Sequence, residues 1–504
     1  MMTITPISLE ACVLVLGSFL LLYEAFAKDR YKNFVAWMAI AGLTLVLVLT
    51  FFTSSAASAA TSAASPAYLR FYRNDLSALF FKRFSLITTI IVLIMSMEYK
   101  EVVCRYIFGV EKEAGLGEFY SLPVFTCAGL MWMASAVDFI LIFVSLELVT
   151  VSFYVLVSYM RRNEGSLEAG VKYLVLGALS TGFFVYGITW IFGVTGETNL
   201  DRIAAALKTM HGMNAPLLFG MMLVLVGLGF KTAAAPFQIW VPDVYQGAPT
   251  PITAYLSVGS KAAGFIVLLR VVETFVNAPE PMRGALLSAL AVIAGLTLIY
   301  GNLAAMPQTN LKRLLAYSSI AHAGYLLLAV ASIGAPYSGE AVAFYLASYL
   351  LMTLLSFIII IVVANATGGD NIAHFNGLNR RAPGLAFAML IAMLSLAGVP
   401  LTAGFFGKFF VFAAAMQQHH YVLAAIGVVT VGAGFYYYLK VVRAMYWLEP
   451  TGETRIVAAP LTRATIFVLT TLIFVFGVYP QPLLNSLRGT PNSGSNNVAQ
   501  VATK

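Results

Sequence analysis

Hydrophobic stretches recur along the whole chain, each about 20 residues long, which is the length an α-helix needs to cross a ~30 Å hydrocarbon core. Polar and charged residues fall mainly in the short connections between them. The fourteen stretches are 5–27, 34–53, 79–98, 119–137, 139–160, 171–194, 215–236, 252–275, 285–305, 315–334, 340–364, 384–411, 420–446 and 463–485. The pattern therefore predicts an all-α membrane protein with about 14 transmembrane helices.

The composition supports a membrane protein and excludes several other classes. Of the 504 residues, 60% are hydrophobic and only 10% are charged, too few to cover a soluble surface. The 30 basic and 22 acidic residues are scattered through short loops, so we expect the lipid bilayer as the surroundings and no nucleic-acid partner. The cysteines form no CxxC pair and the histidines have no metal-ligand spacing, so the chain is predicted to bind no metal.

The basic residues of the loops predict an orientation. If the N-terminus lies outside, fourteen fall on the inner side, namely Lys28, Arg30, Lys32, Lys100, Arg105, Lys112, Arg161, Arg162, Lys312, Arg313, Arg380, Arg381, Arg455 and Arg463. Nine fall on the outer side, namely Arg70, Arg73, Lys82, Arg83, Arg202, Lys208, Arg283, Arg488 and Lys504. The positive-inside rule then places both termini on the periplasmic side. The segments 53–66 and 486–504 are polar connections without a predicted role.

A weak internal repeat predicts the architecture. Lys231 and Lys408 lie 177 positions apart, each in a Gly-rich helix with a proline nearby, and the same shift moves Lys261 next to Lys440. The repeat contains five helices, and an odd number inverts the second copy, so helices 4–8 and 9–13 are predicted to form two inverted repeats. The predicted units are 1–118 with three helices, 119–275 and 276–447 as the repeats, and 448–504 with the last helix and a polar tail.

Four ionisable residues lie deep inside predicted helices. They are Glu147, Lys231, Lys261 and Lys408. A charge at the bilayer centre costs about 3 kcal/mol on insertion scales, so each one needs a partner, water or a function. A carboxylate and several amines in one bundle can pass a proton, because the charge of each site acts on the next. The residues therefore indicate a proton or cation relay, and the alternative is that each charge is satisfied by a structural partner.

Two further residues are weaker relay candidates. His322 could connect Lys261 with Lys408, or it could be a hydrogen-bonded core histidine. Lys440 could be an exit group, or it could anchor the helix at the interface together with the aromatic run 436–438.

Other charges are expected to have local roles. Glu168 and Lys172 are four residues apart at the start of a helix, a spacing that favours an ion pair on the helix surface. Asp138 and Asp243 are expected to mark the edges of the membrane.

Three motifs resemble a known family. The stretch 237–254 reads FQIWVPDVYQGAPTPITA and is followed by SKA at 260–262, while 311–325 and 396–409 match further family motifs. The sequence from about 119 to 447 resembles the antiporter-like membrane subunits of respiratory complex I, the NADH–quinone oxidoreductase. The resemblance implies broken seventh and twelfth helices. Gln238 stands where many relatives have histidine, and glutamine cannot titrate.

The resemblance also implies a function. Glu147, Lys231, Lys261 and Lys408 match the family's proton-pathway groups, so the chain is expected to translocate protons across a bacterial inner membrane. Electron transfer from NADH to quinone would occur in partner subunits, which would bind NADH, FMN, iron–sulfur clusters and quinone. Other membrane subunits of the complex are the expected partners. Two alternatives remain open: an Mrp-type sodium/proton antiporter subunit and a non-transporting membrane scaffold.

Overall fold

The computed structural model describes residues 6–27, 34–53, 70–108, 116–335, 337–450, 452 and 456–487, and its regular elements are helices. The long helices are α1 (Pro6–Phe26), α3 (Val35–Leu49), α4 (Leu76–Glu98), α6 (Gly117–Ser135), α7 (Phe139–Val157), α8 (Glu164–Thr195), α10 (Ala215–Thr232), α13 (Lys261–Phe275), α14 (Glu280–Ala305), α15 (Leu311–Ala331), α16 (Ser338–Thr367), α18 (Pro383–Ala397), α19 (Ala403–Gln417), α20 (Tyr421–Trp447) and α21 (Pro460–Val478). The short ones are α5 (Lys100–Phe108), α9 (Leu200–Thr209), α11 (Val241–Gly247), α12 (Thr250–Tyr255), the π-helix η2 (Leu256–Ser260), the 3-10 helix η3 (Ile372–Phe375), α17 (Leu378–Arg381) and α22 (Gln481–Leu487).

Each of the fourteen predicted hydrophobic stretches corresponds to a helix or to a broken helix. Eleven helices in the described residues are long and apolar enough to cross a membrane. The eighth stretch is α12, η2 and α13 in succession, and the twelfth is α18 followed by α19. Among the helix starts, that of α8 differs most from the prediction: α8 begins at Glu164 rather than near 171, because its first two turns are polar and Asn163 caps them.

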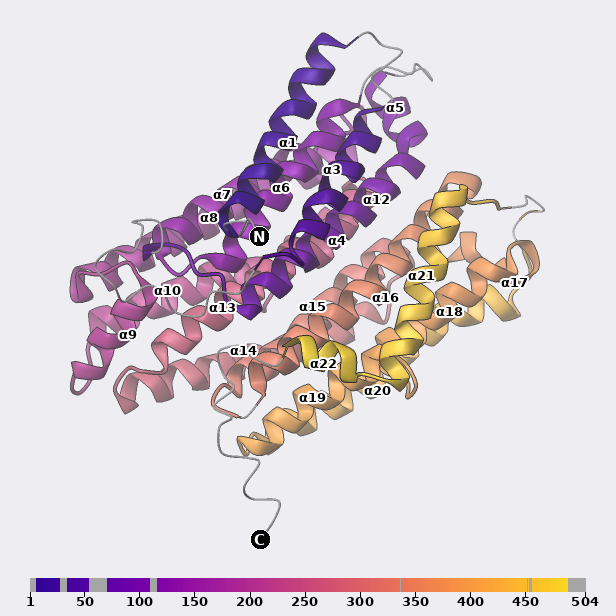
Figure 1. Ribbon diagram of the computed structural model, residues 1–504. Helices are drawn as coiled ribbons and strands as arrows, with labels where there is room; N and C mark the ends of the chain where they lie inside the picture. The colour runs from indigo at the N-terminus through magenta and orange to yellow at the C-terminus, as the bar shows by residue number, and fades with distance from the viewer. Residues whose placement is uncertain are drawn as a thin grey trace.

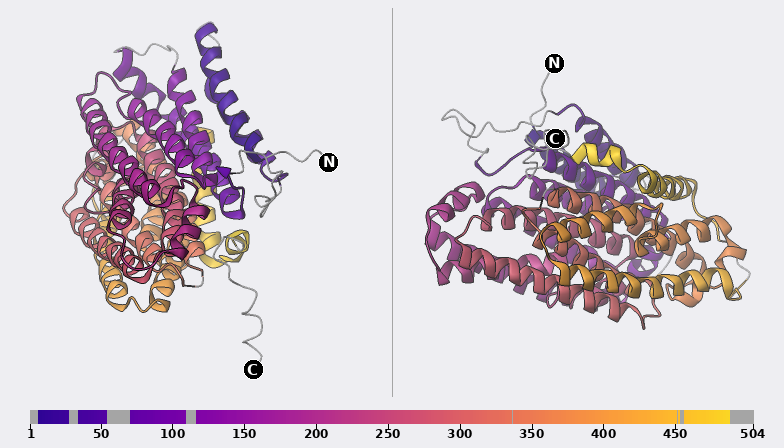
Figure 2. Two further views of the ribbon diagram at one scale, coloured as in Figure 1. Left: turned by 90° about the vertical axis from the view of Figure 1, so that its left-hand side faces the viewer. Right: turned by 90° about the horizontal axis from the view of Figure 1, so that it is seen from below.

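The helices pack side by side as one bundle. Figure 1 shows the first half of the chain, indigo to pink, on one side and the second half, orange to yellow, on the other. Helix α16 joins the halves because it contacts α4 and α12 as well as its own neighbours. The C-terminal helices α21 and α22 lie on one flank in both views of Figure 2, against α16 and α4.

The two ends of the bundle differ: one has paired connecting segments and the other has a polar cavity. At the N-terminal end, where α1 begins, Tyr72 lies beside Ala136 and Asp138 beside Asn199. At the opposite end, a cavity of about 560 Å³ is lined by the segments 99–106, 160–169, 243–250, 310–313 and 364–370. We call this the cavity end.

The seventh and twelfth helices are broken, as the sequence and its resemblance predicted. Helix α10 stops at Thr232 and α11 begins at Val241, while α18 stops at Ala397 and α19 begins at Ala403. Left-handed residues end both first halves, Ala233 with φ 64° and Gly398 with φ 89°. A chain that turns out of a helix in this way leaves carbonyl groups at its end without intrahelical partners.

The two broken helices do not place their lysines equivalently. Lys231 is in the last turn of α10, before the break, whereas Lys408 lies in α19, after the break. The repeat of 177 positions therefore pairs the broken helices but not the positions of the two lysines along them.

The N-terminal three-helix segment contains an unpredicted buried ion pair. Lys82 of α4, one of the charges assigned to the outer side, and Glu10 of α1 are both fully buried, with Nζ and Oε1 2.9 Å apart. Tyr72 and Asn74 accept hydrogen bonds from the same ammonium at 2.5 and 2.8 Å. The contacts fasten α1 to α4.

Several predictions concern residues outside the described part of the chain. They are the orientation residues Lys28, Arg30, Lys32, Lys112, Arg455, Arg488 and Lys504, together with most of the two polar connections.

Candidate functional site

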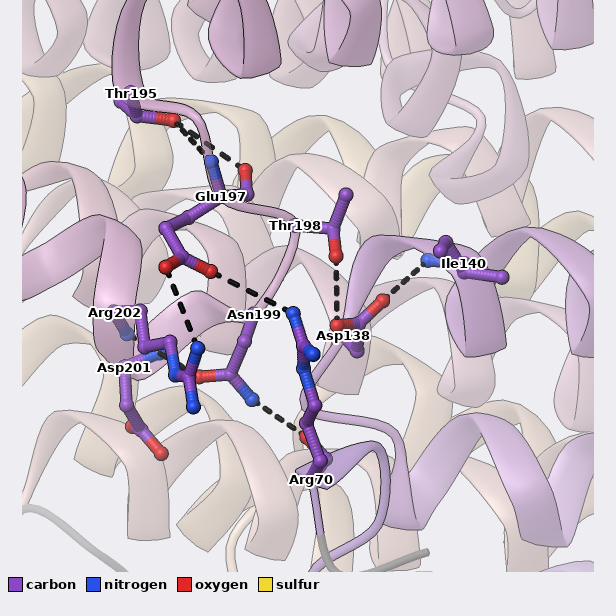
Figure 3. A network of polar contacts seen from close by, with 9 residues as sticks. All are labelled: Arg70, Asp138, Ile140, Thr195, Glu197, Thr198, Asn199, Asp201 and Arg202. Atoms are coloured by element: carbon purple, nitrogen blue, oxygen red, sulfur yellow. Dashed lines mark hydrogen bonds and ion pairs between the residues drawn. The ribbon is translucent and has the colours of Figure 1, made fainter. Parts of the chain in front are cut away.

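Helix α7, which carries Glu147, is fixed at its start by a polar network at the N-terminal end of the bundle (Figure 3). Asp138 is the N-cap of α7 and is fully buried; its carboxylate accepts from the backbone N–H of Ile140 at 2.8 Å and from Thr198 at 2.9 Å. Asn199 in turn donates to the carbonyl of Arg70 at 2.6 Å. Asp138 therefore caps the start of α7, where it accepts from a free N–H group and sets the position of the helix.

Glu147 lies nine residues further along α7 and is half-buried. Its carboxylate accepts a hydrogen bond from Thr181 of α8 at 2.9 Å. Lys231 interacts with Glu147 electrostatically, but its ammonium donates to Thr150, one turn along α7, at 2.5 Å. The Lys231 ammonium therefore contacts the face of α7 that carries Glu147, one turn away, and forms no direct ion pair with the Glu147 carboxylate.

Lys231 is buried within the protein at the end of α10. The small residues Gly227 and Gly229 allow Phe184 and Phe237 to pack close to the helix in the turn before it. The side chain does not extend to a membrane surface, because its ammonium is held by Thr150.

Lys261 is the first residue of α13, directly after the π-helix η2. Its side chain is buried, and its ammonium donates to both the carbonyl oxygen of Ser319, at 2.5 Å, and the hydroxyl of the same residue. The ring of Tyr349 lies 5.4 Å from the ammonium, measured to its centroid. π-Helical turns inside α-helices are frequent at functional sites, and here the turn precedes the lysine.

His322 is one turn along α15 from Ser319 and is fully enclosed. Its Nδ1 is 2.6 Å from the hydroxyl of Tyr345, and its Nε2 is 3.1 Å from that of Tyr438. The imidazole also interacts electrostatically with Lys261 and Lys408. His322 is therefore a hydrogen-bonded core histidine, and its role in connecting the two lysines stays a prediction.

Lys408 is held by the break in the twelfth helix. Its ammonium donates to the carbonyl oxygens of Leu396 and Ala397, at 3.0 and 2.7 Å, which are the last carbonyls of α18. The negative end of the α18 dipole favours a cation there. The ring of Tyr325 lies 5.1 Å from the ammonium, measured to its centroid.

Lys440 is separate from this group. Its ammonium donates to the carbonyl of Gln308 at 2.9 Å, just after α14. In the aromatic run beside it, only Tyr436 is exposed; Tyr437 and Tyr438 are buried. Interfacial anchoring therefore fits Tyr436 but is wrong for the other two, because they form hydrogen bonds inside the bundle.

Sequence reasoning missed the hydroxyl groups that surround the lysines and the histidine. They are Thr150, Thr181, Tyr245, Ser318, Ser319, Tyr325, Tyr345, Tyr349 and Tyr438. A signal was present in α15, where serines and tyrosines cluster around His322 in an otherwise apolar helix. Their partners come from other helices, which the sequence does not show.

Two further polar groups lie close to the broken seventh helix: the ion pair of Lys172, and Gln238. The predicted ion pair of Glu168 and Lys172 is confirmed at 2.6 Å, but Lys172 also bonds Asp243 at the same distance. Gln238 is buried between α10 and α11, and its Oε1 has no hydrogen-bond partner among the described residues.

Three of the buried lysines, Lys231, Lys261 and Lys408, have one feature in common. In the part of the chain that the structure describes, each ammonium donates only to uncharged hydroxyl or carbonyl oxygens. A neutral amine can also donate to such acceptors, so these hydrogen bonds do not require the charge. An arrangement of this kind can release and accept protons.

Comparison with known proteins identifies relatives of the chain. Residues 136–434 match the family described as NADH:quinone oxidoreductase/Mrp antiporter, transmembrane. The NADH-quinone oxidoreductase subunit N of Trichlorobacter lovleyi is 41% identical over 87% of this chain and 86% of its own length.

Solved structures have the same fold. A chain of respiratory complex I from Thermus thermophilus with bound aureothin is 32% identical, with a TM-score of 0.77 over 95% of this chain and 98% of that chain. A chain of the Mrp complex from Dietzia sp. DQ12-45-1b is 20% identical, with a TM-score of 0.76 over 97% of both chains, and shows likeness of fold alone.

Proposed function

The chain belongs to the NADH:quinone oxidoreductase/Mrp antiporter transmembrane family, and we propose that it is the N-type membrane subunit of a bacterial NADH–quinone oxidoreductase. In this role it translocates protons across the inner membrane, next to other membrane subunits of the complex. Partner subunits carry out electron transfer from NADH to quinone and bind FMN, the iron–sulfur clusters and quinone. The cavity end faces the cytoplasm and both termini face the periplasm.

The observation that carries the proton-translocation proposal is the hydrogen bonding of Lys231, Lys261 and Lys408. An ammonium buried without a counter-ion costs several kcal/mol, so a purely structural lysine is normally paired with a carboxylate. Lys231, Lys261 and Lys408 donate only to hydroxyl and carbonyl oxygens. Their protonation is therefore free to change, whereas that of the Glu10–Lys82 pair is held in place by two buried opposite charges.

We propose an order for the relay. Redox work in partner subunits alters the electrostatic interaction between Glu147 and Lys231 at one side of the first repeat. When that interaction weakens, Lys231 holds its proton less tightly, and a proton is pushed through Lys261 towards Lys408. His322 and its two tyrosines connect Lys261 with Lys408, from which the proton leaves on the periplasmic side. A tenfold change in proton affinity at any step corresponds to about 1.4 kcal/mol.

Replacement of Glu147 or Lys231 by Ala in the assembled complex tests this function. We expect fewer protons pumped per NADH oxidised in proteoliposomes, because the first two groups of the relay are removed. The matched control is Glu449→Gln, which removes an exposed ion pair with Arg380 remote from the lysines. Unchanged pumping in fully assembled Glu147→Ala and Lys231→Ala complexes would refute the relay.

The Mrp-type alternative has the same fold. The two functions are distinguished by whether proton translocation requires sodium. Proton translocation that continues without sodium supports the NADH–quinone oxidoreductase role. Strict dependence on sodium would instead assign the chain to sodium/proton exchange.

A further inference from the structure

A cavity lies at the cytoplasmic end of the bundle. It has a volume of about 560 Å³, and its lining is largely polar, with charged side chains from five segments of the chain. A space of this size and polarity can hold many water molecules. Its lining includes Asp243 and Gly247 of α11 and Lys312 and Arg313 of α15.

Asp243 lies in this lining between two cations from different repeats. Its carboxylate accepts from Lys172 of α8 at 2.6 Å and from Arg313 of α15 at 2.7 Å. Arg313 also donates to Gln246, one turn further along α11, at 3.0 Å. We call Lys172, Asp243 and Arg313 the α11 clamp. It ties the short second half of the broken seventh helix to both halves of the protein.

Helix α11 connects the clamp with Lys261. Two residues after Asp243, the hydroxyl of Tyr245 lies 3.3 Å from the hydroxyl of Ser319, the residue that holds the Lys261 ammonium. Tyr245 is almost completely buried. One face of α11 therefore borders the cavity and another covers the partner of Lys261, so α11 separates water in the cavity from the buried amine.

Helix α11 is suited to movement. It has only seven residues, follows the break after α10 and is succeeded by Ala248 and Pro249. A helix of this length has little stability of its own, so its position depends on contacts with neighbours. The clamp residues are partly exposed, with 40% of Lys172, 33% of Asp243 and 30% of Arg313 accessible. Ion pairs exposed to this degree are weak and exchange readily.

We propose that Asp243 is a positioning residue whose clamp holds α11 closed between the cavity and Lys261, and that opening of the clamp admits water to load Lys261 with a proton. The inference rests on the proposed relay. In the loading step an O–H bond of a hydronium ion in the cavity breaks and an N–H bond forms on the neutral Nζ of Lys261. The hydronium ion leaves as water, and the positive charge moves to the ammonium, where Ser319 accepts its hydrogen bonds.

Amide hydrogen exchange of residues 241–248 in the assembled complex tests the clamp. Asp243→Asn removes the charge that both cations share, and we expect exchange of this segment to rise about tenfold, a size typical for loss of hydrogen bonds to a charged group. Protons pumped per NADH oxidised should fall, because an open α11 also lets the loaded proton return. Glu449→Gln, which breaks an exposed ion pair elsewhere, should leave both measurements as in the unaltered complex.

Further variants keep the proposal testable if Asp243→Asn does not assemble. Lys172→Met and Arg313→Met each leave one half of the clamp, so each should raise exchange of 241–248 less than Asp243→Asn does. Adding Lys172→Met to Asp243→Asn should have no further effect. Additive effects, unchanged exchange, or raised exchange with normal pumping would each overturn the proposal.

The outcome is distinguishable from failure of the relay itself. Lys231→Ala should lose pumping while exchange of 241–248 stays unchanged, because that variant leaves the clamp intact. If Lys231→Ala pumps normally, the relay is wrong whatever the exchange of α11 shows.

Discussion

Replacement of Lys261 by Met distinguishes a proton relay from a non-transporting membrane scaffold. Met has nearly the same length and volume, so the substitution removes the ammonium without leaving a large cavity. The ammonium forms two hydrogen bonds, both to Ser319. Hydrogen bonds to charged groups contribute about 1.5–3 kcal/mol each, so their loss costs about 3–6 kcal/mol.

An opposing effect offsets this loss. Lys261 is 2% exposed, and removing a charge buried to this extent recovers a desolvation penalty of several kcal/mol. The Ser319 hydroxyl that remains can bond to the hydroxyl of Tyr245, which already lies 3.3 Å away. The two contributions are of similar size, so we expect stability to change by less than about 2 kcal/mol.

The assay combines stability, electron transfer and pumping in one preparation. Lys261→Met complexes should melt within a few degrees of the unaltered complex and oxidise NADH, yet pump fewer protons into proteoliposomes. Lys261→Ala serves as a comparison, because it adds a cavity and should cost a further 2–5 kcal/mol or so. Loss of assembly in Lys261→Met with no selective pumping defect would refute the reasoning and favour the scaffold, and normal pumping would refute the role of Lys261.

Two other predictions follow from single contacts. Tyr438→Phe removes the hydroxyl that lies 2.5 Å from the Ser318 hydroxyl and 3.1 Å from Nε2 of His322. We expect slower proton pumping with normal assembly in the same proteoliposome assay. The control Tyr436→Phe, on the exposed face, should have no effect. Burial raises the pKa of Asp243, but hydrogen bonds from Lys172 and Arg313 lower it more, so the pKa lies below the ordinary carboxyl value. A depressed pKa means that the clamp is fully formed above the ordinary carboxyl value and is lost as the pH falls through the depressed one. Exchange of 241–248, corrected for its intrinsic pH dependence, should therefore stay constant from about pH 5 to 8 and rise only in stronger acid.

The sequence by itself determined the helices and the main candidates, because the bilayer imposes simple rules. A helix must be about 20 residues long to cross the hydrocarbon, and a charge inside it is costly, so both features are visible in a linear pattern. The same rules identified Glu147, Lys231, Lys261 and Lys408 as residues that need an explanation. Prolines near Lys231 and Lys408 indicated where helices would break.

Only the tertiary structure decided what each charged side chain contacts, because those partners lie far away along the chain. Lys261 and Ser319 are 58 positions apart, and Lys172 and Asp243 are 71 positions apart. Nothing in the hydropathy pattern indicates that Lys82 is fully buried against the carboxylate of Glu10, which comes from another helix. Periodicity shows which residues lie inside a membrane, whereas hydrogen bonds between helices depend on how the faces of the bundle meet.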